Sequence, residues 1–275
     1  MDAKRVLFIT QEIAPYLPES DISLIGRNLP QGIQERGREI RTFMPRFGNI
    51  NERRNQLHEV IRLSGMNLII DDTDHPLIIK VASIQTARMQ VYFIDNEDFF
   101  LRKGTVKDAA GNEYADNDER SIFYVRGVLE TIKKLRWIPD LIHCHGWFAA
   151  LAILYRKRMY ADDPCLKDSK IIYSVYDDEF QTPLRADIIK KLKIDGAHDR
   201  DLAELKKQAG FVELSKLAIN MSDAVIQGSE IIRPELAAHI AQLKSKPVLP
   251  YYGFQNDYID NVNNFYERIL NKAKA

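Results

Sequence analysis

The sequence contains only two cysteines, Cys144 and Cys165, among its 275 residues. Two cysteines are too few for a disulfide framework, and they fit a reducing compartment. The apolar runs are also short. None approaches the ~20 residues that span a bilayer, and the N-terminal run is too short for a secretory signal. We therefore expect a cytoplasmic protein with no membrane association.

The chain also lacks an excess of charge of either sign. Lys plus Arg and Asp plus Glu both number 39, so the formal net charge is zero. A general nucleic-acid binder needs a basic excess to displace counterions from phosphates, so we expect no nucleic-acid partner. Hydrophobic residues make up 45% and charged residues 28% of the chain, which is typical of a globular protein with a sizeable core.

The sequence does contain a series of apolar runs separated by amphipathic stretches. This alternation is typical of βα units and predicts an α/β fold with a doubly wound, mainly parallel, Rossmann-like sheet. The runs predicted to be strands are residues 5–10, 39–44, 77–85, 89–95, 140–145, 170–176 and 223–229. Only three residues separate the third and fourth runs, so we expect these two strands to form an antiparallel hairpin inserted in the sheet.

Helical periodicity occurs between these strands. The predicted helices are residues 21–36, 116–136, 147–159, 230–243 and 255–273. Ser20 or Asp21 is expected to cap the first helix. Asp116 and Glu119 are expected to form a capping box at the start of the second.

The positions of the elements suggest a domain organisation and the place of a site. We expect a Rossmann-like domain over residues 1–250 and a C-terminal helical extension over residues 251–275 that packs on it. In an open α/β sheet, ligands bind beyond the carboxyl ends of the strands. This rule selects the loops at residues 11–21, 143–148, 176–183 and 227–231 as the lining of any site.

Five segments of the chain carry a resemblance to a known family. They read VLFITQEIAPY, NLPQGIQERGREIRTFMPRFG, VYFIDNEDFF, GNEYADNDERSIFYVRGVLE and PDLIHCHGWFAALAILYRKR. In order and spacing they resemble the N-terminal domain of bacterial glycogen synthases and plant starch synthases, over about residues 4–235. The resemblance implies the GT-B architecture, in which two Rossmann-like domains face a cleft. It also implies transfer of glucose from ADP-glucose to the end of an α-1,4-glucan.

The first strand-to-helix loop departs from the pattern of this family. The family has Lys-Thr-Gly-Gly-Leu there, and its lysine neutralises the phosphate charge of the sugar nucleotide. The matching positions here are Pro18, Glu19, Ser20, Asp21 and Ile22. The carboxylates of Glu19 and Asp21 would repel a diphosphate a few Å away, at roughly 1–4 kcal/mol per close pair.

Two other loops and a whole domain depart as well. Gly146 stands where the family pattern His-x-His-Asp-Trp-His has its aspartate, and Tyr176 stands where Thr-Val-His-Asn has its histidine. The second GT-B domain, which in the family holds most of the donor nucleotide site, has no recognisable counterpart, and we expect it to be missing. The resemblance thus implies a fold whose donor-binding motifs are degenerate.

Ten residues are candidates for lining the cleft or binding substrate. They are Tyr16, Glu19, Ser20, Asp21, Asn117, His143, His145, Trp147, Tyr176 and Asp177. We identify no catalytic residue among them and expect no cofactor. His143 and His145 could bind a metal together, but no third ligand is evident. The alternative, a hydrogen-bonded pair of histidines, is favoured, so we expect no metal site.

The remaining candidates each have two interpretations. Carboxylates clustered at residues 177–179 could form a general acid or a cation site, or they could belong to a solvated loop that caps a helix. The rings of Tyr16, Trp147 and Tyr176 could stack on sugars or pack in the core.

Two main hypotheses for function follow. The first is a glycogen/starch synthase-like glycosyltransferase domain that is inactive alone and needs a protein partner to supply the second domain. The second is a non-catalytic module that binds a glucan or another protein and regulates polysaccharide metabolism. A third, new chemistry at an acidic cleft, has no substrate that the sequence suggests.

Overall fold

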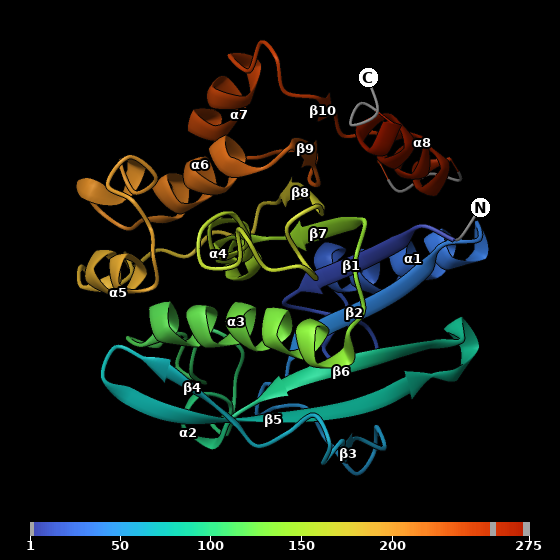
Figure 1. Cartoon of the computed structure of the whole chain (residues 1–275), viewed down its shortest axis with the longest axis vertical. Helices are drawn as coiled ribbons and strands as arrows, with labels where there is room; N and C mark the ends of the chain where they lie inside the picture. Colours follow the sequence, from blue (N-terminus) through green and yellow to red (C-terminus); the bar gives the residue numbers. More distant parts are fainter. Residues whose placement is uncertain (1–2, 254–256, 272–275) are drawn as a thin grey trace.

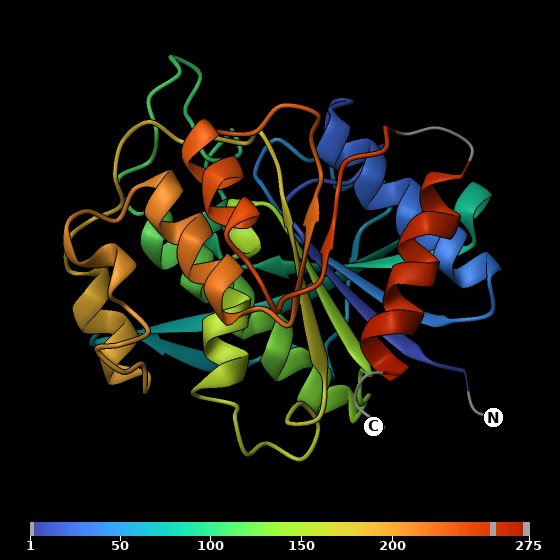
Figure 2. The same cartoon turned by 90° about the horizontal axis from the view of Figure 1, so that it is seen from above.

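The computed structural model describes residues 3–253 and 257–271, and it shows a twisted β-sheet with helices on both faces (Figures 1 and 2). The strands are β1 (Arg5–Thr10), β2 (Glu39–Pro45), β3 (His58–Glu59), β4 (Met66–Ile70), β5 (Thr73–Ile84), β6 (Met89–Asp95), β7 (Leu141–His145), β8 (Lys170–Val175), β9 (Ala224–Gln227) and β10 (Val248–Leu249). Their order in the sheet is β10-β9-β8-β7-β1-β2-β6-β5-β3, and β4 pairs with β5.

The strand directions confirm the predicted fold class. Every neighbouring pair from β10 across to β6 is parallel. The hairpin of β5 and β6 is antiparallel, as are the pairs that β3 and β4 make with β5. The strands β3 and β4 were not predicted. They lie at the outer edge of the sheet, where β3 has two exposed residues and β4 alternates in burial over five, so the local apolar signal is weak.

The helices follow the strands along the chain. They are α1 (Asp21–Glu35), α2 (Glu97–Phe100), α3 (Asn117–Leu135), α4 (Leu151–Lys157), α5 (Ile188–Ile194), α6 (Phe211–Met221), α7 (Pro234–Ala241) and α8 (Tyr258–Asn271), with 3-10 turns at Gln85–Ala87, Trp147–Ala149 and Glu204–Lys206. None of the helices in the described part of the chain combines the length and apolar character that crossing a membrane requires.

The two predicted caps have different outcomes. Ser20 is the N-cap of α1, and its side chain accepts a hydrogen bond from the Ser23 backbone N–H. The capping box predicted at the start of α3 is wrong, because the Asp116 side chain makes no cap hydrogen bond. Its carboxylate accepts instead from the Arg102 guanidinium at 2.6 Å.

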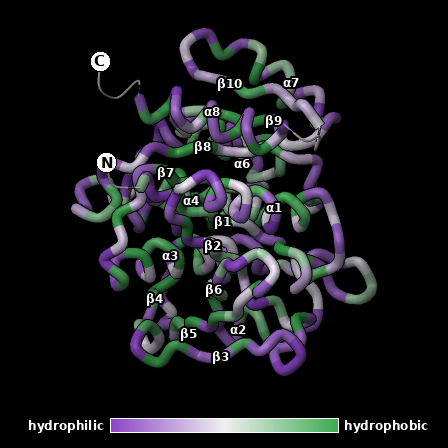
Figure 3. The backbone as a smooth tube through the Cα atoms, turned by 90° about the vertical axis from the view of Figure 1, so that its right-hand side faces the viewer, coloured by the Kyte–Doolittle hydropathy of each residue, from purple (hydrophilic) through white to green (hydrophobic). Residues whose placement is uncertain are grey.

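Each face of the sheet has its own hydrophobic core. Along β1, Val6 and Phe8 pack with α1 and α8 on one face, whereas Leu7 and Ile9 pack with α3, α4 and α6 on the other. This alternation follows from the two-residue period of a strand. In Figure 3 hydrophobic segments run along the central strands, and hydrophilic ones predominate at the outside.

The last described helix, α8, lies beside α1 (Figures 1 and 2). The two helices approach so closely that a Cβ added at Gly32 would lie 2.4 Å from an Ile259 side-chain atom. Ion pairs also join α8 to the turn that follows α1, with 2.6 Å between Arg36 and Asp260 and 2.5 Å between Arg38 and Glu267. The division into a domain and an extension at residue 250 stays a prediction.

Candidate functional site

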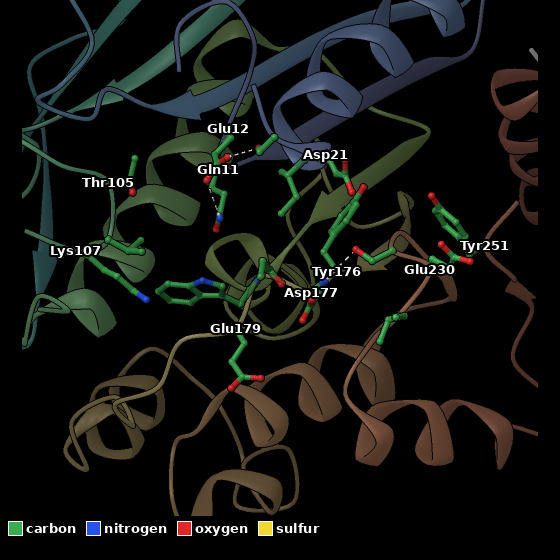
Figure 4. Close-up of a pocket in the computed structure, with 17 residues that line it drawn as sticks. Gln11, Glu12, Asp21, Thr105, Lys107, Tyr176, Asp177, Glu179, Glu230 and Tyr251 are labelled. Carbon is green, nitrogen blue, oxygen red and sulfur yellow. Dashed lines mark hydrogen bonds between the residues drawn. The ribbon is translucent and has the colours of Figure 1, made fainter. Parts of the chain in front are cut away.

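A cavity of about 600 Å³ lies at the carboxyl ends of β1, β7, β8 and β9 (Figure 4). All four loops that the strand-end rule selected contribute to its lining. The loop after β1 and the start of α1 contribute Gln11, Glu12, Ser20, Asp21 and Ile22. The loops after β7, β8 and β9 contribute Trp147, then Tyr176 to Glu179, then Ser229 to Ile231.

Two further segments line the cavity, and the sequence did not indicate either of them. Thr105, Val106 and Lys107 come from the long loop before α3, and Tyr251 follows β10. The long loop is held in place by Glu113, whose carboxylate accepts backbone N–H groups of Gln181 and Thr182 at 2.9 and 2.7 Å. These contacts join segments that are far apart in the chain, so no local pattern could have revealed them.

The structure brings together half of the ten candidate residues. Ser20, Asp21, Trp147, Tyr176 and Asp177 line the cavity. Trp147 and Tyr176 are each only 1% exposed, so their rings mainly pack in the core and are not open platforms for a sugar.

The other five candidates lie outside the lining of the cavity. Glu19 is exposed on the surface. Tyr16 packs edge-on against Phe93, with 4.9 Å between the ring centroids. Asn117 is buried, where it bonds to Arg120 and to a backbone carbonyl. His143 and His145 are 0% and 1% exposed.

The two histidines form hydrogen bonds inside the core on the α8 face of the sheet. His143 bonds to the Tyr266 hydroxyl through Nδ1 and to the Ser174 hydroxyl through Nε2, both at 2.6 Å. Nδ1 of His145 is 2.7 Å from the Tyr176 hydroxyl. Burial lowers the pKa of His143 well below its usual range and lowers the pKa of His145 to about 3, so both rings are neutral.

The cavity wall between β7 and β8 contains a closely fitted carboxylate. Asp178 Oδ2 accepts the Trp147 backbone N–H at 2.8 Å. The same oxygen lies 2.4 Å from the position that a Cβ would take at Gly146, whose φ is +74°. Burial raises the pKa of Asp178 to about 7, and the carboxylates of Glu12 and Asp177 add to this effect.

The electrostatic character of the cavity is strongly acidic. Six carboxylate residues line it: Glu12, Asp21, Asp177, Asp178, Glu179 and Glu230. Lys107 is the basic residue of the lining, and it is 3.4 Å from the Glu113 carboxylate. Glu179 is paired with Arg233 at 3.0 Å. In residues 3–253 and 257–271, the other five lining carboxylates form no ion pair with Lys, Arg or His.

At the start of α1, which faces this cavity, the backbone N–H groups of Ser20 and Ser23 are both in hydrogen bonds. Ser20 N–H donates to Ser23 Oγ at 2.8 Å, and Ser23 N–H donates to Ser20 Oγ at 3.1 Å. The Ser20 hydroxyl donates in turn to Glu12 Oε2 at 2.7 Å. An anion at this helix start would therefore meet the carboxylates of Glu12 and Asp21, although the N-terminus of a helix generally attracts anions.

A metal ion is not suited to this arrangement either. Among the described residues, no three His, Cys, Asp or Glu side chains converge closely enough to hold one. The carboxylates surround the cavity from separate loops, so they act on its potential as a group and do not form a coordination shell.

Comparison with known proteins gives a consistent result. A family model described as the starch synthase catalytic domain matches residues 5–266. A glycogen synthase of Chlorobium luteolum is 32% identical over 236 residues, which are 84% of this chain and 48% of that protein. A glycogen synthase of Chlorobium limicola is 36% identical over 189 residues, which are 68% of this chain and 39% of that protein. The chain thus spans about half the length of the curated relatives it matches.

Among solved structures, the chain is similar to the catalytic domain of starch synthase IV from Arabidopsis thaliana, which was solved bound to ADP and acarbose. The TM-score is 0.68 at 19% sequence identity, and the match covers 82% of this chain and 44% of that one. This similarity supports the fold.

Proposed function

The chain belongs to the starch synthase catalytic domain family, and we propose that by itself it is a glycosyltransferase domain that binds no sugar nucleotide and transfers no glucose. The curated relatives are about twice as long as this chain, so glucose transfer would require a second half of a cleft in addition to these residues. The observation that carries this proposal is the acidic cavity at the start of α1.

The physical argument concerns the diphosphate of a sugar nucleotide. Each carboxylate that lies a few Å from a phosphate costs roughly 1–4 kcal/mol at the effective dielectric of a protein surface. Glu12 and Asp21 both line the cavity at the helix start. Even one such penalty at the upper end weakens affinity by roughly a hundredfold or more, because 1.4 kcal/mol is a factor of ten.

The test is calorimetric titration of the purified chain with ADP-glucose, together with transfer of labelled glucose to glycogen. We expect no measurable binding and no transfer under conditions in which the glycogen synthase of Chlorobium luteolum, the positive control, shows both. Micromolar binding of ADP-glucose, or turnover by the chain alone, would contradict the proposal.

A second candidate function is retention of carbohydrate without chemistry, in a regulatory or scaffolding role. The cavity has a volume suited to a small ligand, and Ile231, which is 76% exposed, lies at its rim with Tyr251. Co-sedimentation with glycogen tests this function. We expect retention that Tyr251→Ala reduces severalfold and that Tyr252→Ala, outside the lining, leaves unchanged. Equal retention of both variants would show that the cavity does not bind the glycogen.

We also propose that the chain works in the cytoplasm. The observation in favour is that Cys144 and Cys165 are both free thiols. Such thiols are typical of reducing compartments. Fractionation of cells that express a tagged chain would test the location, and recovery from an extracytoplasmic fraction would contradict it.

A further inference from the structure

Two buried hydrogen-bond acceptors of the cavity have no partner among the described residues. Gln11 is only 5% exposed and lines the cavity, yet its Oε1 accepts no hydrogen bond. Asp178 Oδ1 is also buried and unpartnered, while its other oxygen is held by Trp147. A buried acceptor without a donor is costly, so each of these atoms calls for an explanation. A ligand that donates hydrogen bonds would satisfy both.

The direction of the Gln11 side chain supports this interpretation. In Figure 4 the side chain extends from the end of β1 toward the middle of the cavity, and Glu12 lies beside it. Its amide nitrogen is 3.4 Å from Glu12 Oε1, a long contact that leaves the amide weakly held by protein groups. The amide is therefore well placed to bond to a molecule in the cavity.

The charge of the surroundings specifies what kind of donor fits. Five carboxylates of the lining have no ion-pair partner within the part of the chain that the structure describes: Glu12, Asp21, Asp177, Asp178 and Glu230. Like charges around one cavity repel one another, and a cation that they share relieves the repulsion. Because no three ligands converge on a metal position in the described residues, an organic cation suits the geometry better than an inorganic one.

The shape of the cavity completes the description of the ligand. Its volume of about 600 Å³ holds a mono- or disaccharide, and Ile231 and Tyr251 provide apolar surface at the rim. An ammonium group near Tyr251 would also be attracted by the face of the ring. We propose that the cavity binds an ammonium group carried on a sugar frame, that is, an amino sugar, with Asp178 and Gln11 as its main acceptors. The sugar frame rests on the proposed function, whereas the ammonium group rests on the acceptors alone.

The test uses three sugars of similar shape. Glucosamine, glucose and N-acetylglucosamine are titrated into ¹⁵N-labelled chain while the backbone amide of Trp147, which donates to Asp178, is followed by NMR. We expect glucosamine to bind at least tenfold more tightly than either neutral sugar and to shift this amide. Its affinity should fall severalfold between low and high salt, since screening weakens charge attraction. Equal binding of all three sugars, or no binding of glucosamine, would overturn the proposal.

Variants separate the acceptor from general charge. Asp178→Asn keeps an oxygen for the Trp147 N–H and removes the charge, and it should weaken the binding of glucosamine about tenfold, a larger loss than for glucose. Asp162→Asn is the matched control, because Asp162 is exposed in the loop before β8, at the opposite end of that strand from the cavity. If the two variants weaken glucosamine equally, Asp178 has no specific role and the proposal fails.

Two further arms identify the source of the ammonium group and separate this proposal from the proposed function. Nα-acetyl-lysine amide carries the charge without a sugar, and binding as tight as that of glucosamine would assign the site to a lysine side chain and overturn the amino sugar. ADP-glucose is measured on the same samples. If ADP-glucose binds, only the proposed function is contradicted. If neither ADP-glucose nor glucosamine binds, only this inference is contradicted.

Discussion

Gly146 and Asp178 occupy adjoining space and depend on each other. The glycine has a φ of +74° and a ψ of 176°, a region that side chains with a Cβ avoid. Its missing Cβ also leaves the space that Asp178 Oδ2 fills. Any other residue at this position would therefore be unfavourable for two reasons, backbone strain and the steric clash with Asp178.

Gly146→Ala is expected to destabilise the fold by roughly 2–4 kcal/mol, because backbone strain and a steric clash add. In the double variant with Asp178→Ala the clash is relieved, so the cost should be smaller than the sum of the single costs. Urea unfolding of the four proteins gives this coupling. Gly37→Ala is the control, since Gly37 has a φ of +83° and nothing within 4 Å of an added Cβ. Simple additivity would show that the carboxylate does not fill that space.

Asp178 also makes the stability depend on pH. Burial raises its pKa to about 7 in the folded chain, against roughly 4 in an unfolded one, so the folded state binds the extra proton between these values. The stabilising contribution is complete below pH 4 and is lost as the pH rises to 7. Asp178→Asn should therefore gain stability over the parent as pH increases, by up to roughly 4 kcal/mol.

The measurement is the urea midpoint of both proteins at pH 4.5, 6 and 8. Asp162→Asn serves again as the exposed control and should run parallel to the parent. A constant difference between Asp178→Asn and the parent across these pH values would show that the carboxyl is already ionised at its normal pKa.

Helix α8 closes the face of the sheet on which His143 and His145 lie. Its Tyr266 reaches the imidazole of His143, and its Ile259 packs against Gly32 of α1. This arrangement explains why the two histidines are core residues. The helix covers the strand end that would otherwise open toward solvent, and burial then keeps both rings neutral.

Two substitutions test how α8 is held. Tyr266→Phe removes the hydroxyl that bonds to His143, and we expect a loss of roughly 1–2 kcal/mol in unfolding free energy, because a buried nitrogen loses its partner. Gly32→Ala places a methyl group against Ile259 and should cost roughly 1–3 kcal/mol through overpacking. Both are measured by chemical unfolding. If Gly32→Ala stabilises the chain, as removal of a helical glycine alone would, α8 does not pack at this distance.

The whole chain has no net charge, but its charge is unevenly distributed. Six carboxylate residues line the cavity at the carboxyl ends of the strands, whereas Lys107 is the basic residue of this lining. The electrostatic potentials of carboxylates on separate loops add within a concave site. The potential in the cavity is therefore more negative than the net charge of the chain suggests. The composition alone would not have excluded a phosphate ligand.

Neutralising part of this charge should weaken the electrostatic repulsion between the cavity and a nucleotide. The double variant Glu12→Gln with Asp21→Asn is expected to raise the affinity for ADP by roughly ten- to a hundredfold over the parent, since one or two repulsive pairs are removed. Glu59→Gln with Asp162→Asn, both exposed, is the control of equal charge. Calorimetry or ADP competition measures the ADP affinity of both double variants. Equal effects would show that the repulsion comes from the net charge of the chain and not from the cavity carboxylates.

Much of the architecture could be predicted because it follows from the local periodicity of apolar residues. The strands β1 and β6 begin and end where their apolar runs do, and β2, β7 and β8 differ from prediction by one residue at an end. The helix expected from residue 230 begins instead at Pro234, since proline suits the first turn of a helix. The short β10 and the helices α5 and α6 were not among the predicted elements, although the buried residues Phe211, Leu214 and Ala218 of α6 recur at helical spacing.

The sequence by itself determined the fold class, the order of the elements, the family and the four loops at the strand ends, because each of these depends on contiguous residues and their spacing. Only the tertiary structure decided which side chains meet. It buried His143 under a tyrosine 123 residues away, brought Lys107 and Tyr251 to the cavity, and placed Asp178 in the space beside Gly146. Such contacts join segments distant in the chain, and packing, which depends on the whole molecule, selects them.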